Sequence, residues 1–182
     1  NPKVVVASKA GLIQRDGDVI DASTGAAVLH FPVAAGNYFV SVQHRNHLGV
    51  RTATAIALAA QAVVVDFSQA TTPVAGTHAR LESTGLALLW AGDANQDGRL
   101  IAMGIGSDTG ALLNVIFKAP QNINLNGSYR LSGYLATDLN MDGVTLLMGP
   151  GNDANILLGN VFLFPSNKDK NANYIAAGGL AR

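Results

Sequence analysis

Two short acidic stretches hold the residues of this sequence that could do chemistry. The stretch GDANQDGRL places Asp93, Asn95 and Asp97 at alternate positions and follows them with Gly98. Forty-five residues further on, the pattern returns as TDLNMDGVT. Side-chain oxygens at alternate positions, followed by a residue that can turn sharply, are typical of a loop that wraps a hard cation such as Ca²⁺. The repetition indicates a pair of cation sites.

The spacing in both stretches matches the first half of an EF-hand calcium loop. In that pattern, positions 1, 3 and 5 supply side-chain oxygens, position 6 is Gly, and position 7 supplies its backbone carbonyl. The ligands predicted on this basis are Asp93, Asn95, Asp97 and the carbonyl of Arg99 in the first loop, and Asp138, Asn140, Asp142 and the carbonyl of Val144 in the second. We therefore predict two Ca²⁺ ions, one in each loop.

Both loops depart from the EF-hand pattern at position 12. The bidentate carboxylate expected there is replaced by Gly104 in the first loop and by Gly149 in the second. Four residues later stand Asp108 and Asp153, each fifteen residues after the first Asp of its loop. We expect loops enlarged by four residues, in which glycines allow a second turn that returns Asp108 or Asp153 to close the shell of the ion.

An apolar segment follows each acidic loop and must position it. Aligning Asp93–Phe117 with Asp138–Phe162 gives eleven identical residues in 25 without a gap. The apolar segments are Ala111–Phe117 and Ile156–Phe164, and the spacing of large apolar residues in the first one predicts a helix. Two copies are too few for a solenoid, so we expect the two loop–helix units to share one core.

The sequence before about residue 85 predicts short β-strands separated by turns. The candidate runs are Lys3–Ala7, Ala27–Phe31, Asn37–Gln43, Arg51–Leu58 and Ala62–Phe67. Within NYFVSVQ, Tyr38, Val40 and Val42 fall on one face, which is the period of a half-buried strand. The expected fold class is a mainly β, sandwich-like module over residues 1–85, followed by a small α-rich module of paired EF-hand-like loop–helix units over residues 86–182. Residues 71–83, rich in Thr, Gly and Pro, are the expected connector.

The repeat resembles the paired calcium loops of dockerin-like modules. Its D-x-N-x-D-G motif, with an extended loop that ends in SD or ND, is similar to a variant found near the C-termini of large secreted proteins of Bacteroidetes-type bacteria. The segments LIQRDGDVID, GNYFVSVQHRNHLGVRT and LLWAGDANQDG are similar to those that precede that repeat in the same proteins. The resemblance implies a strand-rich module leading into a double loop–helix calcium module. The four inserted residues depart from cellulosomal dockerins.

Composition argues against several other classes of protein. The formal net charge is zero and only 13% of the residues are charged, which favours neither a nucleic-acid binder nor a membrane-surface helix. Apolar runs are too short for a transmembrane span. The absence of Cys rules out disulfides and leaves calcium as the expected staple. Because the chain opens NPKVVV without a leader, we expect it to be an excised piece of a longer protein.

No catalytic constellation is recognisable, and we expect no enzymatic activity. Glu82 is the only Glu, so the Glu pair of a glycoside hydrolase is missing. G-x-S-x-G, H-E-x-x-H and phosphate-cradling motifs are also missing. Asp16, Asp18 and Asp21 are close in sequence, but a hydrated hairpin turn accounts for them.

Two other features each have an alternative interpretation. His44 and His47, in HRNH, could ligate a transition metal, but on a strand their spacing sends them to opposite faces. The favoured interpretation is a hairpin corner in which His44, Arg45 and Asn46 bond to backbone, with the charge facing solvent or an adjoining module. Trp90 could be a platform on which a sugar ring stacks, although a core position is the favoured interpretation.

These observations predict a non-catalytic module with structural Ca²⁺, serving as a scaffold or attachment region of an exported multidomain protein, extracellular or at the cell surface. The alternative is a recognition module that docks a cohesin-like protein or another cell-surface component, or that binds carbohydrate. A third possibility is pairing of copies through a sheet edge. Scaffold and docking module differ in the helix faces: Leu112, Ile116, Leu157 and Val161 buried in one core would leave little apolar surface for a partner.

Overall fold

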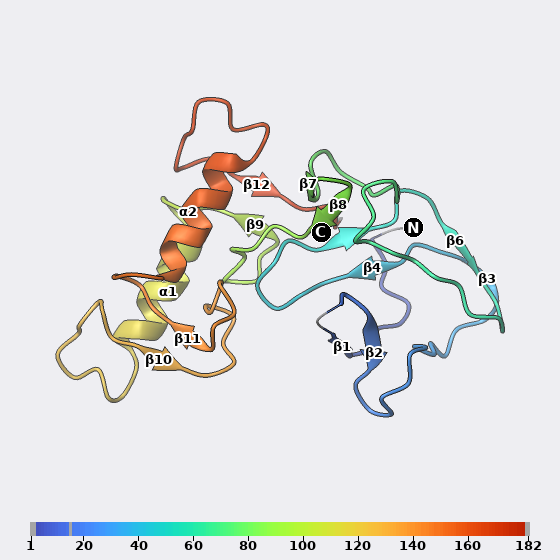
Figure 1. Ribbon diagram of the computed structural model, residues 1–182, viewed down its shortest axis with the longest axis horizontal. Coiled ribbons are helices and arrows are strands. Elements are labelled where there is room, and N and C mark those ends of the chain that lie inside the picture. Colours follow the sequence, from blue (N-terminus) through green and yellow to red (C-terminus); the bar gives the residue numbers. More distant parts are fainter. Residues whose placement is uncertain (1–2, 15, 181–182) are drawn as a thin grey trace.

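The computed structural model of the chain describes residues 3–14 and 16–180 (Figure 1). Within them, α1 spans Asp108–Phe117 and α2 spans Asp153–Leu163, and the two helices pack against each other. The strands are β1 Gly11–Ile13, β2 Val19–Asp21, β3 Gly36–Tyr38, β4 Ser41–Val42, β5 Val50–Arg51, β6 Ile56–Leu58, β7 Leu81–Ser83, β8 Leu86–Leu88, β9 Arg99–Leu100, β10 Leu131–Ser132, β11 Val144–Thr145 and β12 Ala176–Ala177.

The strands of the described residues pair in twos and build no larger sheet. All six pairs are antiparallel: β1–β2, β3–β6, β4–β5, β7–β8, β9–β12 and β10–β11. Two of them belong to the acidic loops, because β9 begins at position 7 of the first loop and pairs with β12, while β11 begins at position 7 of the second and pairs with β10 (Figure 1). Each loop is therefore held near its middle by a short ribbon.

The expected β-sandwich over residues 1–85 is wrong. A sandwich needs two sheets whose inner faces bury apolar side chains against each other, and here the ribbons contain only two or three residues per strand. Val5 and Val64, from two of the expected strands, are 81% and 90% exposed. The alternation in Asn37–Gln43 is confirmed at the level of burial, since Tyr38, Val40 and Val42 are partly buried between exposed neighbours. The alternation of this strand is therefore real, but no second sheet packs against it to form the core of a sandwich.

The expected α-rich character of the second half is also wrong, although the two helices lie where the apolar segments predict them. Outside α1 and α2, the described part of this half consists of short ribbons and turns. Ser107 and Asn152 cap the helices, accepting the N–H of Gly110 and of Asn155 in their side-chain oxygens. Pro165 follows the last turn of α2 and cannot donate a backbone hydrogen bond.

The main core lies around the two helices. Leu112, Ile116, Leu157 and Val161 are each 0% exposed and belong to one cluster, which confirms the expectation of a shared core. Leu48, between β4 and β5, is also a member of this cluster. The expected boundary after residue 85 lies in the turn between β7 and β8. The pairing of these two strands, and the packing of Leu48 against the helical core, therefore join residues on the two sides of the boundary. The division into two units stays a prediction.

Trp90 is part of this core, as the favoured interpretation of the sequence required. It is 1% exposed, lies beside Phe164 with ring centroids 5.2 Å apart, and donates its Nε1–H to the carbonyl of His78 at 2.9 Å. A ring so covered cannot serve as a platform for a sugar. In the described ranges, no helix has the length and apolar character needed to cross a membrane.

Candidate metal-binding loops

The first acidic loop is shaped by hydrogen bonds from its own side chains to its own backbone. Asn95 accepts the N–H of Asp97 at 2.9 Å, and Asp97 accepts the N–H of Arg99 at 2.9 Å. Asp93 accepts the N–H of Gly98 at 3.0 Å through Oδ2. Such Asx turns bend the chain every second residue. The side chains predicted as ligands therefore also determine the path of the loop.

The second loop repeats this arrangement. Asn140 accepts the N–H of Asp142 at 2.9 Å, Asp142 accepts the N–H of Val144 at 2.9 Å, and Asp138 accepts the N–H of Gly143 at 3.1 Å. Each of these bonds lies 45 positions after its counterpart in the first loop. Equal sequence spacing has thus produced the same three turn hydrogen bonds in both copies.

Each loop makes two left-handed turns at matching positions. Gln96 and Met141, at position 4, have φ angles of 62° and 60°, and the glycines at position 6 follow with 78° and 85°. Glycine adopts this conformation without a Cβ clash, which explains its presence at position 6. A second pair of left-handed glycines lies in each insertion, Gly104 and Gly106 in the first and Gly149 and Gly151 in the second.

Those glycines return Asp108 and Asp153 to the start of their loops, as the sequence predicts. Asp108 accepts the N–H of Asn95 at 3.2 Å through Oδ1 and the N–H of Ile101 at 2.9 Å through Oδ2. Asp153 accepts the equivalent N–H groups of Asn140 at 3.2 Å and Leu146 at 2.8 Å. Both residues are 0% exposed. Each closing carboxylate therefore joins the two ends of its loop from the first residue of a helix.

Burial makes the charge on the closing carboxylates unfavourable. It raises the pKa of Asp108 to about 7, against the lowering effect of the Ile101 and Asn95 hydrogen bonds, and the negative charges of Asp93 and Asp97 raise it further. Burial likewise raises the pKa of Asp153. A proton or a cation close to these carboxylates relieves the repulsion. The same carboxylates that hold the loops together thus favour a positive charge nearby.

The donors fit calcium by type and order but do not form a cluster of carboxylates. Among the residues that the structure describes, no three His, Asp or Glu side chains form a group that could hold a metal ion. Asp97 and Asp142 are exposed, whereas the first and closing Asp of each loop are buried. Calcium takes six to eight oxygens, among them amide and backbone carbonyl oxygens. Any site here therefore depends on the mixed set of donors along each loop.

The segment His44–His47 lies against both loops, which its sequence did not predict. The expectation that its two histidines face apart is wrong, because their Nδ1 atoms are 2.8 Å apart and the rings pack edge to face. The expected bonding to backbone is confirmed, since Arg45 donates to the carbonyl of Leu135 at 3.1 Å. Burial lowers the pKa of His47 to about 4. The sequence signal for this contact was the pair Arg45 and Asn46 between the two histidines. Their partners Leu135 and Asp138 lie about ninety positions further along the chain, so the sequence did not identify them.

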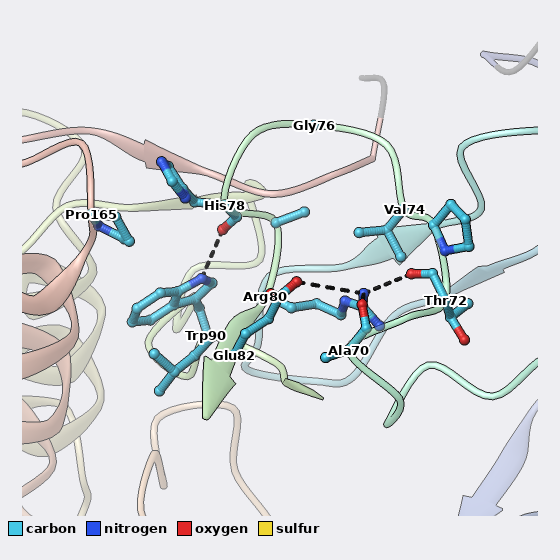
Figure 2. Close-up of a pocket in the computed structure, with 12 residues that line it drawn as sticks. Ala70, Thr72, Val74, Gly76, His78, Arg80, Glu82, Trp90 and Pro165 are labelled. Carbon is cyan, nitrogen blue, oxygen red and sulfur yellow. Dashed lines mark hydrogen bonds and ion pairs between the residues drawn. The ribbon is translucent and has the colours of Figure 1, made fainter. Parts of the chain in front are cut away.

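A separate cavity of about 360 Å³ lies beside Trp90 and Arg80 (Figure 2). Arg80 is 5% exposed, and its guanidinium donates to the carbonyls of Phe67, Gln69, Ala70 and Thr72. Figure 2 shows this side chain reaching toward Thr72 and Ala70, away from His78 and Trp90. Because most of its donors bond to backbone, Arg80 serves to hold the segment 67–72 in place.

Comparison with protein-family models, curated proteins and solved structures finds no match to this chain. The resemblance to dockerin-like modules consequently rests on the repeat and its flanking segments alone.

Proposed function

We propose that this chain is a non-catalytic module in which each acidic loop binds one Ca²⁺ ion. The ion would be held by Asp93, Asn95, Asp97, the Arg99 carbonyl and Asp108 in the first loop, and by Asp138, Asn140, Asp142, the Val144 carbonyl and Asp153 in the second. Ca²⁺ would supply the positive charge that offsets these carboxylates and tie each loop to its helix. The role of the ion is structural.

One observation carries the proposal: the two loops share the hydrogen bonds of their Asx turns and of a returning buried carboxylate, in 45-residue register. A single acidic turn is common on protein surfaces and needs no ion. Two copies that each bury their first and last carboxylates favour a cation nearby, because burial of charge is costly. At Asp138 the guanidinium of Arg45, 3.4 Å from Oδ2, supplies part of the positive charge. Both copies place alternate oxygen donors between those buried ends.

Burial of the helix faces supports the scaffold over the docking alternative. The four apolar positions on which docking would depend, Leu112, Ile116, Leu157 and Val161, are 0% exposed. We therefore propose a scaffold or attachment role within an exported, extracellular or cell-surface protein. The export follows from the resemblance stated above, and weak calcium affinities of about 10⁻⁴ to 10⁻³ M suffice in extracellular modules.

The test is thermal unfolding in EDTA, in millimolar Ca²⁺ and in millimolar Mg²⁺. The variant is Asp97→Asn with Asp142→Asn, because both side chains are exposed and Asn keeps the oxygen that accepts the N–H of Arg99 or Val144. A matched control, Asp16→Asn with Asp169→Asn, removes the same charge from two exposed positions outside the loops.

We expect Ca²⁺, and not Mg²⁺, to stabilise the unchanged chain and the control. The stabilisation is about 2.7 kcal/mol per site when Ca²⁺ is present at one hundred times its Kd. The loop variant should unfold like the unchanged chain in EDTA and lose most of the response to Ca²⁺. Equal midpoints for the unchanged chain in EDTA and in Ca²⁺, with no heat of binding by calorimetry, would refute the proposal.

A further inference from the structure

Asn46 lies between the first residues of the two loops. Its side-chain Nδ2 donates to the backbone carbonyl of Asp138 at 2.5 Å. Its backbone carbonyl accepts the N–H groups of Gly92 at 2.8 Å and Asp93 at 3.1 Å. The residue is 0% exposed. One buried residue therefore holds the backbone at position 1 of both loops.

The preceding residue, Arg45, repeats this double attachment. Its guanidinium donates to the carbonyl of Leu135 at 3.1 Å, lies 3.4 Å from Oδ2 of Asp138, and covers the ring of Tyr134 at 3.8 Å. Its backbone carbonyl accepts the side-chain N–H of Gln96 at 3.1 Å. Arg45 and Asn46 both lie in the connection between β4 and β5.

The segment His44–His47, which we call the corner, therefore gives the two loops a shared attachment in addition to the packed helix pair. Hydrogen bonds inside a protein are directional, and a buried donor left without its acceptor costs about 1 to 3 kcal/mol. A movement of Asp93 that displaced Asn46 would therefore strain its bond to Asp138. Conversely, an ion that orders one loop would hold Asn46 in place for the other, so the second ion would meet a loop already ordered.

We propose that Asn46 is a positioning residue that couples the two loops, so that Ca²⁺ binds to them with positive cooperativity. This inference rests on the calcium function proposed above. Coupling is reciprocal: each ion raises the affinity of the other loop by the same factor.

The test is a thermodynamic cycle measured by calorimetric titration with CaCl₂. Asp97→Asn leaves the second loop to bind alone, and Asp142→Asn leaves the first. The product of the two association constants of the unchanged chain, divided by the product of the two single-loop constants, gives the coupling factor. We expect a factor of about ten in the unchanged chain and a factor near one when Asn46→Ala is added to all three chains.

A second variant covers the case in which Asn46→Ala does not fold. Gln96→Asn shortens the side chain that reaches Arg45, while Asn tolerates the positive φ of 62° at this position. The matched control is Met141→Asn, at the same position of the second loop with a φ of 60°. Thermal unfolding in EDTA reports whether each variant is folded. Gln96→Asn should lower the coupling factor, and Met141→Asn should leave it near ten.

Each outcome has a separate meaning. Absence of calcium binding by the unchanged chain overturns the calcium function, and the coupling with it. Binding by both loops with a factor of one overturns the coupling alone. A coupling factor that stays near ten in folded Asn46→Ala and in Gln96→Asn would show that the corner does not couple the loops. A factor that falls as much in Met141→Asn as in Gln96→Asn would show the same.

Discussion

Asp153 accepts the backbone N–H of Leu139 at 2.7 Å, whereas Asp108 has no equivalent bond because the N–H of Ala94 donates to the carbonyl of Gly92. Asp153 thus accepts three backbone N–H groups and Asp108 accepts two. The two otherwise similar loops differ in how firmly their closing carboxylates hold them.

This difference predicts unequal costs for removing the two carboxylates. In EDTA, Asp153→Ala should lower the free energy of unfolding more than Asp108→Ala, by about 1 kcal/mol or more, because it leaves one more buried N–H without an acceptor. Urea unfolding of both variants, compared with the unchanged chain, measures the two costs. Equal costs, or a larger cost for Asp108→Ala, would contradict this assignment of bonds.

His47 predicts a loss of stability in acid. Burial, with the nearby His44 and Arg45, lowers its pKa from 6.5 to about 4 in the folded chain. The unfolded chain therefore takes up this proton first as the pH falls, so the contribution of His47 to stability is present above about pH 6.5 and is lost toward about pH 4.

The measurement is the free energy of unfolding at several values between pH 7 and pH 4, for the unchanged chain and for His47→Gln. We expect the variant to lose less stability over this interval, since Gln has no proton to take up. Titration of the ring by NMR provides an independent check, and an imidazole of His47 that titrates near pH 6.5 would be the contrary result.

Gly92 predicts a large effect of adding a single methyl group. Its φ is 133°, and a Cβ there would lie 2.4 Å from the side chain of Leu100 and 3.0 Å from that of Leu157. Gly104, with a φ of 110°, has no atom closer than 4.0 Å to such a Cβ. Gly92→Ala should thus lower the free energy of unfolding by more than Gly104→Ala, which carries the backbone strain alone, about 1 to 3 kcal/mol.

Urea unfolding in EDTA compares the two glycine variants without any effect of calcium. We expect Gly92→Ala to exceed Gly104→Ala by about 1 to 3 kcal/mol, the usual cost of overpacking a core. Equal losses would show that Leu100 and Leu157 yield to the added methyl group, and that the first loop is not packed tightly against the core.

The local parts of this protein could be predicted from its sequence. Alternate Asx residues, a Gly at position 6 and an Asp fifteen residues after the first determine hydrogen bonds that close within one loop, and helical spacing places α1 and α2. The hairpin around Asp16 and Asp18 is equally local. In each case the interacting groups are close in the chain, so their order alone brings them together.

Only the tertiary structure decided how the remaining segments meet. Alternation in residues 37–43 is compatible with a sandwich or with an isolated ribbon, and the choice depends on whether distant strands pair, which periodicity does not encode. The placement of Asn46 on Asp138, 92 positions away, has the same origin. The corner at His44–His47 joins the loops because packing of Leu48 into the helical core brings it there, and that contact exists only once the chain has folded.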